Sequence, residues 1–298
     1  MKNFNSKLKI FSALFCTTAI ACSGFALAGC GEDDQTIKIS SVAELEQALG
    51  DEDIDGKTLT LTADLTLDDT LLVENTITID GQGKYTIKAN KTWAGTYKNL
   101  VSVEAKEAKT LTLKNITIDG NNTVRCVYAD GENTLKVEGA TITNGSRGDT
   151  NAPGVYVTQK AHFEMKSGKI VGNAYPESNA NKDSHDYIYS QDLWIGANAT
   201  GNILGGEIGY MFVNANDYSA INPANFLQVT VNGGKIENAY VEYFKAENAS
   251  ESDAGATLLY KNGVISNLFV AQNVNGVNQK VEALAKGTTY TGGKDYNA

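Results

Sequence analysis

The sequence predicts an all-β solenoid, a fold in which short strands wind into coils that stack on one another. Seven isoleucines recur, and a small or turn-forming residue lies three positions before each of the last six. Four of the six intervals between successive markers lie between 24 and 29 residues, which is typical of one coil of a repeat. Apolar and polar residues alternate within the intervals, which indicates two or three short strands in each. The marker isoleucines are Ile79, Ile118, Ile142, Ile170, Ile208, Ile236 and Ile265.

The first 29 residues read as an export signal. Lys2, Lys7 and Lys9 supply a basic start, and an uncharged run of apolar and small residues follows from position 10 to position 28. Because such a segment is removed on export, we do not expect it in the folded domain. An uncleaved membrane anchor is the alternative, since the run nearly reaches spanning length.

Residues 27–30, Leu-Ala-Gly-Cys, close this run and resemble the lipobox of bacterial lipoproteins. The resemblance implies cleavage before Cys30 and attachment of diacylglycerol to its sulfur, and two or more acyl chains hold a protein stably on a membrane. Residues 30–36 are then a solvated tether, and the folded part lies outside the cytoplasm, at the surface of a bacterial cell. The mature domain keeps one cysteine, Cys126, in a strand-like segment that favours burial over reactivity.

The charge of the chain narrows the classes of partner. The formal net charge is −10, and loss of the three signal lysines, with no acidic residue among the first 29, gives −10 − 3 = −13. This acidity argues against nucleic acid as a partner. It also works against uronic-acid polymers unless a cation mediates the contact.

One short helix is expected before the coils begin. Residues 37–39 form a short strand, and Ser41 and Glu44 have the spacing of a capping box ahead of the apolar Leu45. From Leu59 onward the apolar period changes from helical to alternating, so only strands and turns are expected.

The coils are expected to extend over residues 37–283 and to be followed by a poorly ordered tail over residues 284–298. One interval, from Ile170 to Ile208, spans 38 residues, so residues 173–191 are expected to leave the coil as a loop. Loops on a rigid scaffold commonly carry function, which makes this segment the first place to look for a site. A tolerated insertion is the alternative.

Over residues 37–283, the repeated strand and turn phrases and the preceding helix resemble the right-handed parallel β-helix proteins of the pectate-lyase superfamily. The resemblance implies a right-handed parallel β-helix whose open end is capped by the helix. It leaves the function open, because that architecture serves lyases, hydrolases, adhesins and passive surface proteins alike.

Polar residues follow the marker isoleucines at turn positions. Asn144, Asn238 and Asn267 each lie two residues after a marker and are expected to stack as an amide ladder. Asp80 and Asp119 occupy an Ile-Asp-Gly turn, so we interpret them as turn formers rather than as a catalytic carboxylate pair.

No catalytic constellation is visible in the sequence, and no catalytic residue is predicted. Lyases of the superfamily use calcium-binding acidic residues with a basic residue, and its hydrolases use three aspartates on adjacent coils. The two arginines, Arg125 and Arg147, lie outside any such motif, and the two histidines, His162 and His185, lack metal-ligand spacing. A polysaccharide lyase or glycoside hydrolase remains a competing prediction that rests on the resemblance alone.

An acidic segment before the first full coil matches the opening of a calcium-binding loop. Asp51, Asp53 and Asp55 stand at alternate positions, and Gly56 follows at the sharp turn. Thr62 replaces the bidentate glutamate that should close such a loop. Calcium is therefore the one cofactor considered, and the alternative is an acidic turn that leads into the next strand.

Three aromatic residues form the candidate ligand-binding surface. Phe212, Tyr240 and Phe269 are the central members of apolar triplets at matching offsets from their marker isoleucines. Alternation puts the outer members of each triplet on one face and the aromatic on the other. If the valine after each aromatic points inward, the rings form an outward column, spaced about 4.8 Å per coil, that could stack against sugar rings. The alternative is that the rings fill the core or are covered by another segment.

These observations predict a lipid-anchored, cell-surface β-helix that serves as a non-catalytic carbohydrate-binding or adhesin-like module. Its expected ligand is a polysaccharide or a glycan of the cell envelope, and its expected membrane contact is through Cys30. The competing predictions are an enzyme of the β-helix type and a passive structural surface protein with a smooth exterior of threonine, asparagine and lysine.

Overall fold

The computed structural model describes residues 35–95, 99–145, 153–173, 192–196, 198–216, 228–244, 256–271 and 278–291. The chain divides into two units, Met1–Asp34 and Gln35–Ala298, and the second contains all of the described residues. The expected signal, Cys30 and the loop over residues 174–191 lie outside the described residues. The lipid anchor and the loop therefore stay predictions.

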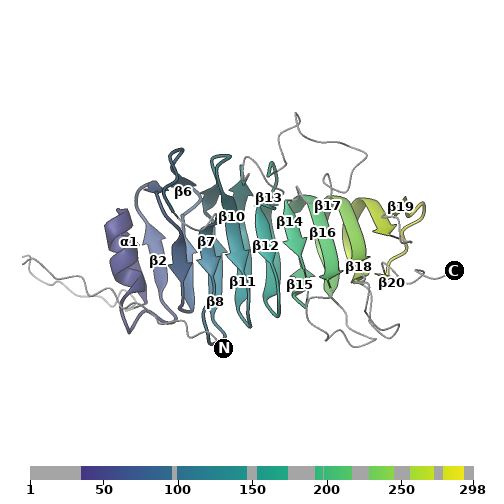
Figure 1. The fold of residues 1–298 in the computed structure, drawn as a ribbon, viewed down its shortest axis with the longest axis horizontal. Helices are drawn as coiled ribbons and strands as arrows, with labels where there is room; N and C mark the ends of the chain where they lie inside the picture. Colours follow the sequence, from purple (N-terminus) through teal and green to yellow (C-terminus); the bar gives the residue numbers. More distant parts are fainter. Residues whose placement is uncertain are drawn as a thin grey trace, which may run out of the picture. The chain divides into compact units, whose positions relative to one another are not determined.

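The described chain begins with a strand and one helix, as the sequence predicts. β1 (Thr36–Ile39) leads into α1 (Val42–Leu49), and the Ser41 hydroxyl caps the helix by accepting a hydrogen bond from the Glu44 backbone N–H at 3.2 Å. The Glu44 carboxylate accepts in return from the N–H of Ser40, at 2.6 Å, one residue before the usual capping-box partner. α1 packs against β1 and β3 and covers the end of the coil (Figure 1). Within the described segments, no helix is long and apolar enough to span a bilayer.

The strands of one continuous sheet pair in three parallel columns, here called sheets 1, 2 and 3, along the stacked coils that Figure 1 shows from one side. Sheet 1 contains β1, β2 (Thr58–Leu61), β5 (Ile77–Asp80), β8 (Thr110–Lys114), the first parts of β11 (Thr134–Thr143) and β13 (His162–Ile170), β15 (Thr200–Ile203), and the first parts of β17 (Val229–Phe244) and β18 (Thr257–Ala271). Sheet 2 contains β3 (Leu65–Leu67), β6 (Thr86–Ala89), β9 (Thr117–Asp119), the last parts of β11 and β13, the first part of β16 (Glu207–Asn216), and the middle of β17 and β18.

Sheet 3 contains β4 (Leu71–Val73), β7 (Asn99–Val103), β10 (Arg125–Ala129), β12 (Val155–Val157), β14 (Leu193–Ile195), the second part of β16, and the ends of β17 and β18. In all three sheets each strand pairs in parallel with its equivalent in the coils before and after it. This is the topology of a parallel β-helix, so the predicted fold class is confirmed.

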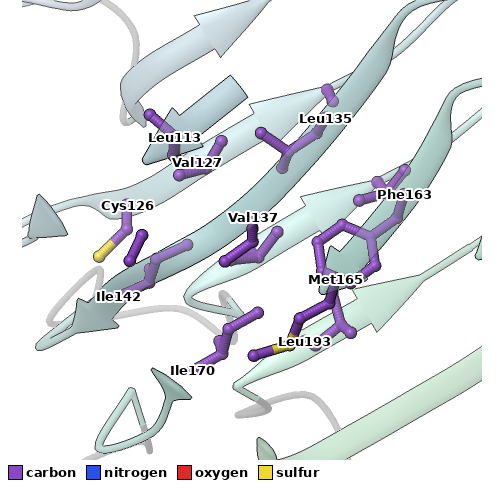
Figure 2. Close-up of a cluster of buried hydrophobic side chains, with 14 of the residues drawn as sticks. Leu113, Cys126, Val127, Leu135, Val137, Ile142, Phe163, Met165, Ile170 and Leu193 are labelled. Carbon is purple, nitrogen blue, oxygen red and sulfur yellow. The ribbon is translucent and has the colours of Figure 1, made fainter. Parts of the chain in front are cut away.

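The interior enclosed by the sheets is filled by apolar side chains from alternate strand positions. All seven marker isoleucines are exposed by 5% or less. Figure 2 shows part of this interior, where Leu135, Val137 and Phe163 from two neighbouring coils are fully buried. Full burial of an aliphatic or aromatic side chain contributes about 1.5–3 kcal/mol, so these inward columns hold the coils together.

Both aspartates that the sequence places in turns behave as predicted. Asp80 Oδ1 accepts from the N–H of Gln82, and Asp119 Oδ1 accepts from the N–H of Asn121, both at 2.8 Å. Each carboxylate thus closes a turn through its own backbone two residues later. Their assignment as turn formers is confirmed.

The expected asparagine ladder is found only in part. Asn267 Nδ2 donates to Asn238 Oδ1 at 3.2 Å, so these two amides stack between coils as predicted. Asn144 Nδ2 instead donates to Asp119 Oδ1 at 2.9 Å. The prediction of a pure amide ladder is wrong at this end, because the preceding coil carries an aspartate in that turn.

The prediction of a poorly ordered tail from residue 284 is wrong for part of that segment. β20 (Thr288–Thr291) pairs antiparallel with the first part of β18, and β19 (Asn278–Lys280) pairs antiparallel with its end. Both strands cover backbone groups that the last coil would otherwise leave open for pairing with another chain. Their short polar sequences lack an apolar alternation, which is why the pattern did not reveal them.

Candidate functional site

The three predicted aromatic residues lie in one column on the outer face of sheet 3. Phe212 pairs in register with Tyr240, and Tyr240 pairs with Phe269. The apolar residues on either side of each aromatic point to the interior and are exposed by 6% or less: Met211, Val213, Ala239, Val241, Leu268 and Val270. The predicted alternation is therefore confirmed, and the rings do not fill the interior of the coil.

The column is twice as long as the sequence predicts. Tyr128 pairs in register with Tyr156, Tyr156 with Trp194, and Trp194 with Phe212. Six aromatic side chains on six successive coils therefore follow one another on this face, and we call them the aromatic ladder. Its members are Tyr128, Tyr156, Trp194, Phe212, Tyr240 and Phe269.

Sequence reasoning missed the first three members because their distance from the preceding marker isoleucine varies. Tyr156 follows Ile142 by 14 residues and Trp194 follows Ile170 by 24, whereas Phe212 follows Ile208 by only 4. A usable signal was present nonetheless. Each of the three is the centre of an apolar-aromatic-apolar triplet, residues 127–129, 155–157 and 193–195.

Four pairs of neighbouring rings are in contact, three of them tilted and one stacked. Tyr156 and Trp194 have ring centroids 4.7 Å apart and planes inclined by 36°. Tyr128 with Tyr156, and Trp194 with Phe212, are inclined by 54° and 55° at 5.7 and 5.3 Å. Tyr240 and Phe269 are stacked, at 4.8 Å and 12°.

The ladder is not uniformly accessible. Phe212 is 0% exposed, although it lies on the outer face. Its five companions are half-buried. Phe212 therefore supports the ladder by packing against Trp194, and its predicted role as a residue that touches ligand would require it to become uncovered.

Arg125, in the first strand of the ladder, adds a cation to this surface. Its guanidinium carbon lies 5.6 Å from the ring centroid of Tyr128 and 5.0 Å from that of Tyr156. Its Nη1 donates to Asn99 Oδ1 at 2.9 Å. The cation is thus held on the aromatic surface by the rings and by the preceding coil.

Hydrogen-bonding groups border the same end of the ladder. The Tyr128 hydroxyl donates to Asp130 Oδ2 at 3.1 Å, and Gln159 Nε2 donates to the same oxygen at 3.2 Å. Burial raises the pKa of Tyr128, and the neighbouring Asp130 carboxylate raises it further to a smaller extent. The phenol therefore keeps its proton at neutral pH, which suits a hydrogen-bond donor rather than a general base.

Gly196 leaves space for the ladder. A Cβ at this position would lie 2.9 Å from Trp194 Nε1 and 3.2 Å from Tyr156 Cε2. Both distances are shorter than ordinary van der Waals contact, so any side chain here would displace the rings. The small residue is therefore part of what positions Trp194.

The predicted calcium residues are not brought together as a ligand set. Asp51 Oδ1 accepts from the N–H of Asp53 at 3.0 Å. Asp55 Oδ1 accepts from the N–H of Thr76 at 2.7 Å, and its Oδ2 pairs with Lys109 Nζ at 2.6 Å. Across the described residues, no three His, Cys, Asp or Glu side chains are grouped so that they could hold a metal ion.

The remaining candidate groups are distributed over the coil. His162 Nδ1 lies 2.7 Å from Thr200 Oγ1 on sheet 1, and burial lowers its pKa. Cys126 is buried in the interior, which raises the pKa of its thiol and agrees with the expected burial. Arg147 and His185 lie outside the described residues.

A buried aspartate that the sequence did not suggest holds the two ends of the expected loop. Asp192 is 2% exposed, and its Oδ1 accepts from both the N–H and the Nδ2 of Asn173, at 2.9 and 3.0 Å. Its Oδ2 accepts from the N–H of Tyr210 at 2.8 Å. Burial raises the pKa of Asp192 despite these hydrogen bonds. The pair joins residue 173 to residue 192, the two described residues on either side of the segment predicted to form a loop.

With this geometry in place, comparison with known families gives one match. Residues 36–151 match the model of a family described as "Putative pectate lyase-like adhesive domain". That segment resembles a pectate lyase-like adhesive domain. The parallel sheets agree with the pectate lyase-like fold, and the matched segment includes Arg125 and Tyr128 at the start of the ladder. The searches of curated proteins and of solved structures found no similar chain.

Proposed function

We propose that this protein is a lipid-anchored, adhesin-like module of the bacterial cell surface that binds polysaccharide along the outer face of sheet 3. The observation that carries the proposal is the aromatic ladder. Six aromatic side chains occupy outward positions on successive coils, where a solvated sheet face ordinarily carries polar residues. An outward aromatic strip of this kind, interrupted in its exposure at the buried Phe212, is typical of an interaction surface.

The neighbours of the ladder favour a glycan as the partner. A pyranose ring presents an apolar C–H face and a rim of hydroxyl groups, so it needs an aromatic surface bordered by donors and acceptors. The half-buried Tyr156 and Trp194 provide the aromatic surface. Asp130 and Gln159 lie beside Tyr128 and provide the polar border. The extended repeat of the ladder suits an extended polymer.

Two further observations support the surface location. The family match over residues 36–151 is to an adhesive domain. The sequence at residues 27–30 resembles a lipobox and would place a diacylglycerol on Cys30. A tether and an acyl anchor would hold the coil outside the membrane with sheet 3 available to a polymer.

The test is retention of the full-length protein on insoluble or gel-embedded polysaccharides from plant, host and bacterial sources. Trp194→Ala is the test variant, because it removes the central accessible ring. Val264→Ala is the matched control, since Val264 is an apolar side chain, 53% exposed, on another face of the coil. Retention is measured well below the melting temperature of each variant, so that folded protein is compared with folded protein.

The proposal predicts that wild type and Val264→Ala are retained alike by at least one polymer. Trp194→Ala should bind that polymer at least about tenfold more weakly, the equivalent of roughly 1.4 kcal/mol. Equal retention of all three proteins would show that the ladder is only a structural stack. Absence of retention on the whole panel would contradict glycan binding, and release of newly formed chain ends would favour the enzyme instead.

A further inference from the structure

We infer that the ladder binds uncharged, hydroxyl-rich polysaccharides and rejects polyuronates, in contrast to what the pectate lyase-like fold suggests. The inference rests on the proposed function, because it specifies the ligand class of the same surface. The charges at the Tyr128 end of the ladder carry it.

Acidic side chains lie on three successive coils, the last of which carries Tyr128, the first ring of the ladder. β4, β7 and β10 end at paired residues, and an acidic residue follows each of these strands: Glu74, Glu104 and Asp130. By strand alternation they point outward, on the same face as Tyr128. Successive coils are about 4.8 Å apart, so the three carboxylates form an acidic row beside the start of the ladder.

Arg125 offsets only part of that row for an incoming anion. It donates to the neutral amide of Asn99 and lies against two rings of the ladder, so it keeps its charge, but it is one cation against three carboxylates. Lys160 Nζ, which lies in the following coil, pairs with Glu132 Oε1 at 3.1 Å. The charge of Lys160 is therefore balanced by Glu132 and does not offset the acidic row. The border of the ladder is therefore net acidic around Tyr128.

A polyuronate carries one carboxylate on every sugar. When bound along the ladder, it would bring these carboxylates close to the acidic row of the protein. Two like charges about 4 Å apart repel by about 1 kcal/mol even in bulk water, and the repulsion is repeated on each coil. Uncharged sugars avoid this repulsion. Their hydroxyl groups can donate to the same carboxylates, which are acceptors only when ionised.

A bridging cation is the usual way for an acidic surface to take a polyuronate. Within the described part of the chain, no three acidic, His or Cys side chains are grouped to hold such a cation. Asp130 is also occupied in part, since one of its oxygens accepts from Tyr128 and Gln159. The geometry thus favours direct contact with neutral sugars.

The experiment compares retention of the full-length protein on neutral polymers (a mixed-linkage β-glucan, a galactomannan and a dextran) with retention on polygalacturonate. Each polymer is tested with calcium chloride, with EDTA, and at about 50 and about 500 mM salt, where screening lengths differ by about threefold. Glu104→Gln combined with Asp130→Asn removes two charges of the row. Glu52→Gln combined with Asp51→Asn removes the same charge from the exposed cap region and serves as the control.

The inference predicts retention on a neutral polymer that neither EDTA nor salt changes by more than about twofold, with no retention on polygalacturonate. The row variant should gain retention on polygalacturonate at low salt, whereas the cap variant should not. Polygalacturonate retained by the wild type, with or without calcium, would overturn the inference and leave the proposed function standing. Failure of every polymer to retain the wild type would overturn both.

Discussion

The outer faces of sheets 1 and 3 belong to the same coils and enclose the same interior, yet they carry opposite kinds of side chain. The outward column in the centre of sheet 1 is polar until it ends at Leu259 in the last coil, and its paired polar residues are Thr36, Thr58, Thr78, Thr112, Lys136, Glu164, Asn202 and Thr230. The equivalent column of sheet 3 begins with Leu72 and Ser102 and continues as the aromatic ladder. Inward positions are apolar in both sheets because packing dictates them, whereas outward positions are free to differ. The difference therefore points to sheet 3 as the face selected for contact.

The largest effect should come from inward residues, and it should be the same for both sheets. Leu135 on sheet 1 and Leu193 on sheet 3 are both 0% exposed. Either residue replaced by alanine should lower the free energy of unfolding by about 2–5 kcal/mol, through lost burial and a residual cavity. Denaturant unfolding measures this, and a loss below about 1 kcal/mol at one of the two would break the equivalence of the interiors.

A smaller loss is expected for an outward residue of sheet 3. Trp194→Ala removes ring contacts with Tyr156 at 4.7 Å and Phe212 at 5.3 Å. Each aromatic pair contributes about 0.5–1.5 kcal/mol, so we expect a destabilisation of about 1–3 kcal/mol together with the loss of polysaccharide retention. A loss of stability as large as that of Leu193→Ala would instead show that Trp194 stabilises the fold as a core residue does.

Gly196→Ala should disturb the ladder without removing any ring. The added Cβ would lie 2.9 Å from Trp194 Nε1, so the indole must move. We expect weaker polysaccharide retention and an unfolding free energy lowered by about 1–2 kcal/mol. Gly50→Ala is the control, because its Cβ would be 3.6 Å from its nearest neighbours and its φ of −83° suits alanine. Unchanged tryptophan fluorescence and retention in Gly196→Ala would show that the site tolerates the shift.

The smallest effect is expected on the outer face of sheet 1. Thr78→Ala and Thr112→Ala, alone or together, remove outward hydroxyl groups of half-buried residues at paired positions. Each should change the free energy of unfolding by no more than about 0.5 kcal/mol and leave retention on polysaccharide unchanged. If the double variant lost retention, binding would belong to the polar face and the contrast between the sheets would lose its functional meaning.

The fold could be predicted from the sequence because its interior repeats. The marker isoleucines and the alternation around them report inward positions, and Ser41 with Glu44 reports the capping helix. β20 could not be predicted in this way, because its residues pair on the edge of the last coil without entering an apolar pattern. A regular core is readable from one sequence, whereas an edge strand depends on what it pairs with.

The candidate site could be predicted only where insertions do not interrupt the repeat. Phe212, Tyr240 and Phe269 keep a constant offset from their markers, so their column was visible. Tyr156 and Trp194 follow interrupted turns and were missed. The burial of Phe212 also could not be predicted, because the sequence gives the direction of a side chain on a strand and not what covers it.

The most direct test of the ladder as the contact face is covalent footprinting of the full-length protein with and without a bound polysaccharide. The polymer is the one that retains the wild type, and labelling is read residue by residue by mass spectrometry. The account predicts that bound polymer protects Tyr156 and Trp194 on sheet 3 and leaves the peptides around Thr78 and Thr112 on sheet 1 unchanged. Protection confined to sheet 1, or to neither face, would contradict it.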